Sequence, residues 1–147
     1  MFNFEDSLKL SEAMARFFAL SGFDARSYTD PWVKVKLGPI PFRLPNPPMR
    51  QRAVPLHDLH HIVTGYETTL LGEGEVSAWE IGSGGLGRYP IGWFYVLSAV
   101  LAGLFLSPRA ILAAYRRGRG AKNLFGREFH GELLAKSVGE LRRELGI

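Results

Sequence analysis

The stretch from His57 to Glu73, HDLHHIVTGYETTLLGE, concentrates residues that could bind a metal ion. It holds three of the four histidines of the chain, with an aspartate among them. On a helix that advances about 100° per residue, His57, Asp58 and His61 share one face, whereas His60 lies on the other flank of His57. The chain has no cysteine, so any metal must use imidazole and oxygen ligands. Such ligands suit zinc and also iron, manganese or cobalt.

The segment 62–72 is long enough to end this helix and turn, which would bring Glu73 back beside the histidines. We therefore predict a metal site of His57, Asp58, His61 and Glu73, with a position for water or substrate if the site is catalytic. The alternative is a solvated helix surface whose histidines and carboxylates bind nothing. Spacing alone does not decide between them.

Three further residues could take part in chemistry at such a site. Glu80 follows Glu73 by two helical turns, so it should lie on the same face and could support a ligand or accept a proton. It could equally be a surface carboxylate. Tyr66 and Trp79 could flank an aromatic ring, or they could belong to the core.

Several helices are expected to position these residues. The apolar spacing of residues 8–20 predicts a first helix, capped by Asp6 or Ser7 and ended by Gly22. A second helix should begin at Pro55 and end at Gly65, and a third should begin at Glu73 and end in the glycine-rich stretch 82–87.

The remaining elements complete a mainly α single domain over residues 1–147. Val33, Val35 and Leu37 alternate with lysines, which predicts a small N-terminal β-strand or hairpin followed by a proline-rich extended loop. We divide the chain into an N-terminal helix plus extended segment, 1–54, and a helical core that carries the metal motif, 55–147. Helical segments are expected at 91–106 and 109–120, and a docked amphipathic helix should close the chain through Leu133, Leu134, Val138, Leu141 and Leu145.

The segment 91–106 has no charged residue but is shorter than the roughly 20 residues that span a bilayer. It is therefore expected to be a buried or interfacial helix. A basic run follows it, with no acidic residue from Arg109 to Arg127, and the chain has a net charge of +4 and a pI of about 9.6. These features favour a peripheral contact with an anionic membrane surface. The alternative is an ordinary core helix beside a solvated basic face.

Other partners and locations are disfavoured by the sequence. We find no zinc finger or RNA-recognition signature, so nucleic acid is not an expected ligand. The glycines of GSGGLG lack the lysine and hydroxyl residue of a phosphate-binding P-loop, so a flexible turn is expected there. The N-terminus MFNFEDSLKL does not resemble a signal peptide, which favours a cytoplasmic location at the inner face of a membrane.

The motif around His57 also carries a resemblance. The pattern His-Asp-x-x-His, eleven residues and Glu, filled here by His57, Asp58, His61 and Glu73, is similar to the signature of the coenzyme Q biosynthesis protein 4 family. Gly65, LGE at 71–73, the Trp79–Glu80 pair, GRGAKNL at 118–124 and ELRRELGI at 140–147 also resemble family features. Together they cover about the last two-thirds of the chain.

This resemblance implies a mainly helical, peripheral membrane protein of ubiquinone biosynthesis. It implies a metal, most simply zinc, at His57, Asp58, His61 and Glu73, and an apolar groove for an isoprenoid lipid. The implied activity is that of a lyase that removes the ring carboxyl of a polyprenyl-hydroxybenzoate oxidatively and replaces it with hydroxyl. The alternative is a non-catalytic scaffold with a structural metal. Expected partners are the prenylated substrate, other quinone-biosynthesis proteins and further copies of the chain.

Overall fold

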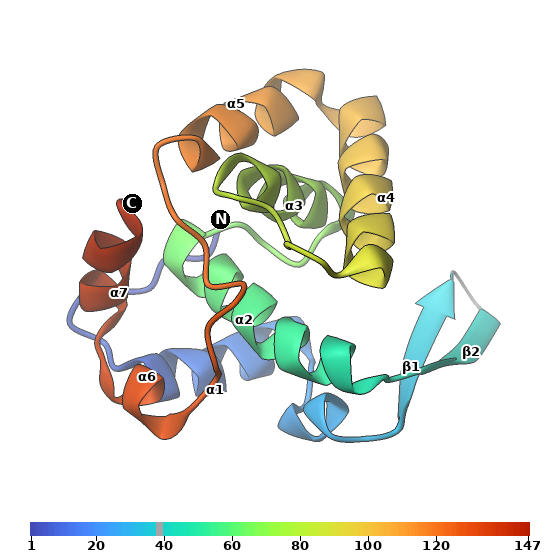
Figure 1. Cartoon of the computed structure of the whole chain (residues 1–147), viewed down its shortest axis with the longest axis horizontal. Coiled ribbons are helices and arrows are strands. Elements are labelled where there is room, and N and C mark those ends of the chain that lie inside the picture. The colour runs from blue at the N-terminus through green and yellow to red at the C-terminus, as the bar shows by residue number, and fades with distance from the viewer. Residues whose placement is uncertain (38–39) are drawn as a thin grey trace.

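The computed structural model describes residues 1–37 and 40–147, and it is mainly helical, as the sequence predicted (Figure 1). The chain runs through the following elements: α1 (Leu10–Ser21), the 3-10 helix η1 (Ala25–Tyr28), β1 (Trp32–Leu37), β2 (Ile40–Pro45), α2 (Pro48–Thr64), α3 (Leu70–Gly82), α4 (Pro90–Leu106), α5 (Pro108–Gly118), α6 (Gly131–Ala135) and α7 (Val138–Leu145).

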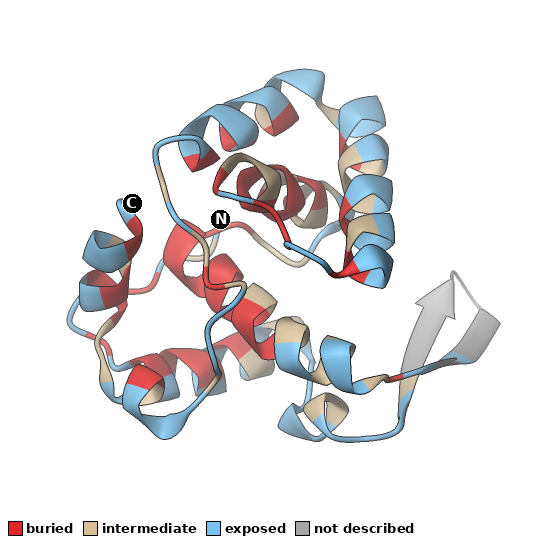
Figure 2. Cartoon of the chain, in the orientation of Figure 1, coloured by how far each residue is buried: buried red, intermediate tan, exposed pale blue. Residues whose placement is uncertain are grey.

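Two helices, α2 and α3, occupy the interior of the fold. Figure 1 shows α3 flanked by α5 and α4, while α2 crosses below it and contacts α1, η1 and α7. In Figure 2 burial is greatest along α2 and α3, whose buried side chains include Leu59, Ile62, Val76 and Trp79. The metal-motif residues therefore lie on the two helices that are best fixed by packing.

Close backbone approach fixes α3 against its neighbours. A Cβ built on Gly118 of α5 would lie 2.3 Å from the Trp79 carbonyl oxygen, and one on Gly74 of α3 would lie 2.9 Å from the Ala99 carbonyl oxygen of α4. Only glycine permits contacts this close. The glycines thus allow α4 and α5 to pack directly onto the backbone of α3.

The second helix begins earlier than predicted, at Pro48 rather than Pro55. Pro55 lacks the N–H that would bond to the Gln51 carbonyl, but the turn before it is held from outside the helix. Gln51 donates from Nε2 to the Asn46 carbonyl at 2.9 Å, and Arg50 donates to Asn46 Oδ1 at 3.0 Å. Asn46 in turn donates to the Asp30 carbonyl at 2.8 Å. These side-chain bonds extend α2 by two turns.

Two other predictions were wrong for one shared reason. The first helix begins at Leu10, with Lys9 at the N-cap position and no side-chain cap from Asp6 or Ser7, and the closing helix is split into α6 and α7. The backbone around Leu8 pairs with the backbone around Ser137: Leu10 N–H donates to the Lys136 carbonyl, and Val138 N–H donates to the Leu8 carbonyl, both at 2.8 Å. Backbone groups used in this pairing are lost to both helices.

The third helix also starts before its predicted position, at Leu70 instead of Glu73. Thr69 caps it by accepting a hydrogen bond from Gly72 N–H at 3.1 Å, as threonine commonly does at an N-cap. Glu73 therefore lies in the first turn of α3, where its charge complements the positive end of the helix dipole.

An antiparallel hairpin is present in the N-terminal region, as predicted, with Trp32 opposite Pro45 and Leu37 opposite Ile40. The predicted alternation also placed Val35 and Leu37 on one side of the strand, but their side chains lie outside what the structure describes. The extended loop expected after the strand is shorter than predicted because β2 and the start of α2 occupy most of it.

The apolar helix α4 has one buried edge and a broad exposed face. Gly92, Val96 and Gly103 are buried, whereas Phe94 is 69% exposed and Phe105 is 84% exposed. Of the two predicted alternatives, a buried or an interfacial helix, full burial does not hold for this face. Across the part of the chain that the structure describes, no helix combines the length and hydropathy needed to cross a membrane.

Candidate metal centre

The structure brings together three of the four predicted ligands. One nitrogen or oxygen atom from each of His57, His61 and Glu73 lies within 4.8 Å of the others. His57 and His61 are one helical turn apart on α2, and Glu73 reaches them from the first turn of α3. Glu73 and His57 are partly exposed, whereas His61 is buried. These three residues can hold a metal ion.

The Nδ1 atoms of His57 and His61 form hydrogen bonds that orient both imidazole rings. His57 Nδ1 lies 2.7 Å from Glu80 Oε1, and His61 Nδ1 lies 2.9 Å from the Tyr66 carbonyl oxygen. Since an ionised carboxylate and a carbonyl only accept, both Nδ1 atoms carry protons. In the neutral rings both Nε2 atoms therefore present lone pairs, and metal-binding histidines are commonly fixed by this kind of bond.

The two ring nitrogens and the two oxygens of Glu73 are spaced as ligands of one ion would be. His57 Nε2 lies 3.2 Å from His61 Nε2 and 3.3 Å from Glu73 Oε2, and His61 Nε2 lies 3.4 Å from Glu73 Oε1. Ligands of a tetrahedral ion with bonds of about 2.0–2.1 Å lie about 3.3 Å apart. Two lone pairs and a carboxylate at this separation repel unless a cation or proton lies between them, so the residues fit a divalent ion.

The charges around Glu80 set the protonation of this carboxyl and of His57. Burial opposes ionisation of this carboxyl, but attraction to His57 and hydrogen bonds from His57 and His60 outweigh it and hold its pKa at about 2. Burial likewise opposes the protonation of His57, but the attraction of Glu80 together with hydrogen bonds to Glu73 and Glu80 raises its pKa well above its ordinary value. The metal-free protein therefore favours the imidazolium form of His57, and a bound metal ion would take the place of the Nε2 proton. Glu80 is thus a permanent anion at neutral pH, suited to orient His57 rather than to store a proton.

Asp58 points to a partner outside the three-residue group. It is buried, and its Oδ2 accepts a hydrogen bond from the Tyr28 hydroxyl at 2.5 Å. Burial raises the pKa of Asp58, against the lowering effects of His57 and the Tyr28 hydrogen bond. The aspartate therefore lies near the histidines, but its described bond joins α2 to η1.

The end of α2 is anchored by long-range hydrogen bonds. Gly65 ends the helix in the left-handed conformation, with φ of 83°. Arg117 of α5 donates to the Thr64 carbonyl at 2.8 Å, and Arg142 of α7 donates to the Val63 carbonyl at 2.9 Å. These bonds satisfy carbonyls that the helix itself leaves unpaired. They also fix the turn that carries the Tyr66 carbonyl to His61.

A cleft of about 760 Å³ opens beside the candidate site. His57, Asp58, Glu73 and Glu80 are among the residues that line it. Its other walls come from η1, β1, α2, the loop between α3 and α4, α4 and the loop after α5, and include the apolar residues Val54, Leu86, Val96, Ala99 and Phe125. The volume is within the range of about 300–1,000 Å³ that is typical of small-molecule sites.

Sequence reasoning missed several contributors to this site. Tyr28 lies 30 residues before Asp58, and the Leu124 backbone bonds to His60 across 64 residues. The Tyr66 carbonyl belongs to the backbone and has no side-chain signal. The Tyr66 and Trp79 rings are buried and are not among the residues that line the cleft, which supports their assignment to the core.

Comparisons with protein-family models, with curated proteins and with solved structures gave no match to this chain.

Proposed function

We propose that the protein uses a zinc ion held by His57, His61 and Glu73 to bind and transform a prenylated aromatic acid in the adjoining cleft. The observation that carries this proposal is the convergence of two oriented imidazoles and a carboxylate, from His57, His61 and Glu73, beside a cleft that His57 and Glu73 line. A bound divalent ion would polarise the substrate's carboxylate or phenol. Asp58, the fourth ligand predicted from the sequence, accepts a hydrogen bond from Tyr28 instead and is not included in this ligand set.

Different residues would have different roles in binding such a substrate. Apolar walls such as Val54, Leu86 and Val96 would exclude water from the aromatic body and the start of the prenyl chain. Glu80 would keep the Nδ1 proton on His57 and so maintain its lone pair toward the ion. Three ligands rather than four would leave a position for the substrate.

The transformation that the family resemblance implies can be written in balanced form. The bond between the ring and its carboxyl carbon breaks and releases CO2, and a ring carbon–oxygen bond forms. Dioxygen supplies the new oxygen atom. Its second oxygen atom leaves as water, with two electrons and two protons from an added reductant. Dioxygen and a two-electron donor are therefore co-substrates in this proposal.

The exposed face of α4 supports a peripheral membrane position for the same protein. This face includes Phe94, Leu97, Leu101 and Phe105, and the following helix α5 carries the exposed residues Arg109 and Arg116. Figure 2 shows that much of the ribbon of α4 and α5 is exposed. An exposed apolar helix followed by a basic helix suits the headgroup region of an anionic bilayer. A prenylated substrate would be taken from such a surface.

The same exposed face favours a second candidate, a non-catalytic scaffold that binds an isoprenoid lipid and has a structural metal.

We would supply the zinc, iron, manganese or cobalt form with a polyprenyl-hydroxybenzoate, dioxygen and a reductant, and measure CO2 and the hydroxylated ring product. The enzyme proposal expects product from wild type and none from Glu73→Gln. Bound metal and extracted isoprenoid lipid without product would support the scaffold instead.

A further inference from the structure

His60 is the histidine of the cluster that lies outside the candidate ligand group, yet both of its ring nitrogens are paired. Nε2 accepts from the Leu124 backbone N–H at 2.9 Å, and Nδ1 lies 2.7 Å from Glu80 Oε1. An amide N–H only donates, so Nε2 has no proton and Nδ1 must carry one. The protein thus fixes His60 as a neutral donor to Glu80.

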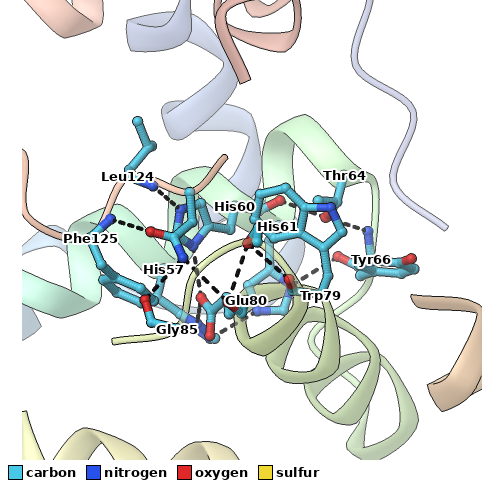
Figure 3. Close-up of polar contacts among 12 residues, drawn as sticks. His57, His60, His61, Thr64, Tyr66, Trp79, Glu80, Gly85, Leu124 and Phe125 are labelled. Carbon is cyan, nitrogen blue, oxygen red and sulfur yellow. Dashed lines mark hydrogen bonds and ion pairs between the residues drawn. The ribbon is translucent and has the colours of Figure 1, made fainter. Parts of the chain in front are cut away.

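The oxygen that His60 bonds is the one that also accepts from His57. Glu80 Oε1 lies 2.7 Å from Nδ1 of each histidine (Figure 3). A continuous chain of hydrogen bonds therefore runs from Leu124 N–H through His60 and Glu80 to the candidate ligand His57. Glu80 Oε2 has no hydrogen-bond partner within residues 1–37 and 40–147, so the placement of this carboxylate depends on Oε1.

Packing fixes the His60 ring in the orientation that this chain of bonds requires. The ring is fully buried, with its centroid 5.2 Å from that of Trp79 and 5.0 Å from that of Phe125 (Figure 3). Asn123 donates to the Gly85 carbonyl at 3.0 Å and so holds the segment that carries Leu124 against the end of α3. His60 is therefore a rigid link between this segment and the candidate metal centre.

We propose that His60 is a positioning residue for the metal site, acting through Glu80 on His57. It holds the Glu80 carboxylate where that group keeps a proton on His57 Nδ1 and the lone pair on Nε2. This proposal rests on the proposed metal-binding function. Loss of such a supporting hydrogen bond typically weakens metal binding 10–100-fold.

Two substitutions separate the two bonds of His60. In His60→Asn the amide nitrogen can replace Nδ1 as the donor to Glu80, while the acceptor for Leu124 is lost. In His60→Gln the amide oxygen can replace Nε2 as the acceptor for Leu124, while the donor to Glu80 is lost. The pair therefore distinguishes support of the metal site from simple attachment of the Leu124 segment.

We would measure zinc affinity by competition with a chromophoric chelator, the visible spectrum of the Co²⁺ form, and the thermal unfolding of each metal-free protein. We expect His60→Asn to bind zinc within about threefold of wild type, and His60→Gln to bind about 10–100-fold more weakly with an altered Co²⁺ spectrum. The proposal would be overturned if His60→Gln had the same zinc affinity and Co²⁺ spectrum as wild type. It would also be overturned if both variants bound zinc equally weakly and both had lost thermal stability to a matching extent. A wild-type protein that binds no zinc would instead remove the proposed function, and this proposal with it.

Discussion

Replacing Glu80 with glutamine should destabilise the metal-free protein by an amount that depends on pH. Glu80 is fully buried, and its charge is stabilised by His57 and His60, which outweigh the cost of burial. Lowering its pKa from 4.5 to about 2 corresponds to about 3 kcal/mol at neutral pH. Glutamine keeps the acceptor oxygen but loses the charge, so we expect a loss of about this size at pH 7.

The pH dependence follows from the direction of the shift. A carboxyl whose pKa is lowered on folding adds stability above its unfolded pKa, here about 4.5, and loses that contribution as the pH falls toward 2. The difference in free energy of unfolding between wild type and Glu80→Gln should therefore be full at pH 7 and shrink steadily below pH about 4.5.

Urea unfolding followed by far-UV circular dichroism would measure this difference after dialysis against a chelator. The control is Glu128→Gln, which removes an exposed carboxylate and should leave stability within about 0.5 kcal/mol of wild type. The reasoning is refuted if Glu80→Gln is as stable as wild type at pH 7, or if its deficit is the same at pH 7 and pH 3.

Three further predictions test packing, metal binding and the exposed face. Gly118→Ala should lower the free energy of unfolding by about 1–3 kcal/mol because its Cβ would overlap the Trp79 carbonyl. The control Gly120→Ala, whose Cβ would meet nothing within 4 Å, should be close to wild type. Equal effects of the two changes in urea unfolding would argue against the close α3–α5 packing. Zinc at 100 times its dissociation constant should raise the free energy of unfolding of wild type by about 2.7 kcal/mol and should have no such effect on His61→Ala. Thermal unfolding with and without a chelator would measure both effects. Stabilisation of both proteins would place the ion elsewhere. Phe105→Glu should reduce co-sedimentation with anionic vesicles more than Leu20→Glu, an exposed change on α1; equal binding would exclude the α4 face as the contact.

Local spacing predicted much of the helical framework. The apolar period and Gly22 located α1, and Gly65 located the end of α2, because these signals act within one or two helical turns. The same local geometry predicted that His57 and His61 share a face and that His60 does not. The approach of Glu73 depended only on a short connection between two helices, which is also a local property.

Long-range contacts account for what the sequence did not reveal. Asn46 holds the turn of α2 that precedes Pro55, and the pairing of residues 8–10 with residues 136–138 shapes the starts of α1 and α7. The bonds of Asp58 to Tyr28 and of His60 to Leu124 likewise join distant segments. A helical wheel places a side chain on a face but does not show which distant group it will meet.

The metal content of the untagged protein tests the central claim most directly. Plasma mass spectrometry after equilibration with zinc and gel filtration would be applied to wild type, His57→Ala, His61→Ala and Glu73→Ala, with His130→Ala as the histidine control outside the site. We predict one zinc per chain in wild type and in His130→Ala, and no stoichiometric zinc in the other three. A wild-type protein without zinc, or full zinc content in the three site variants, would contradict the account.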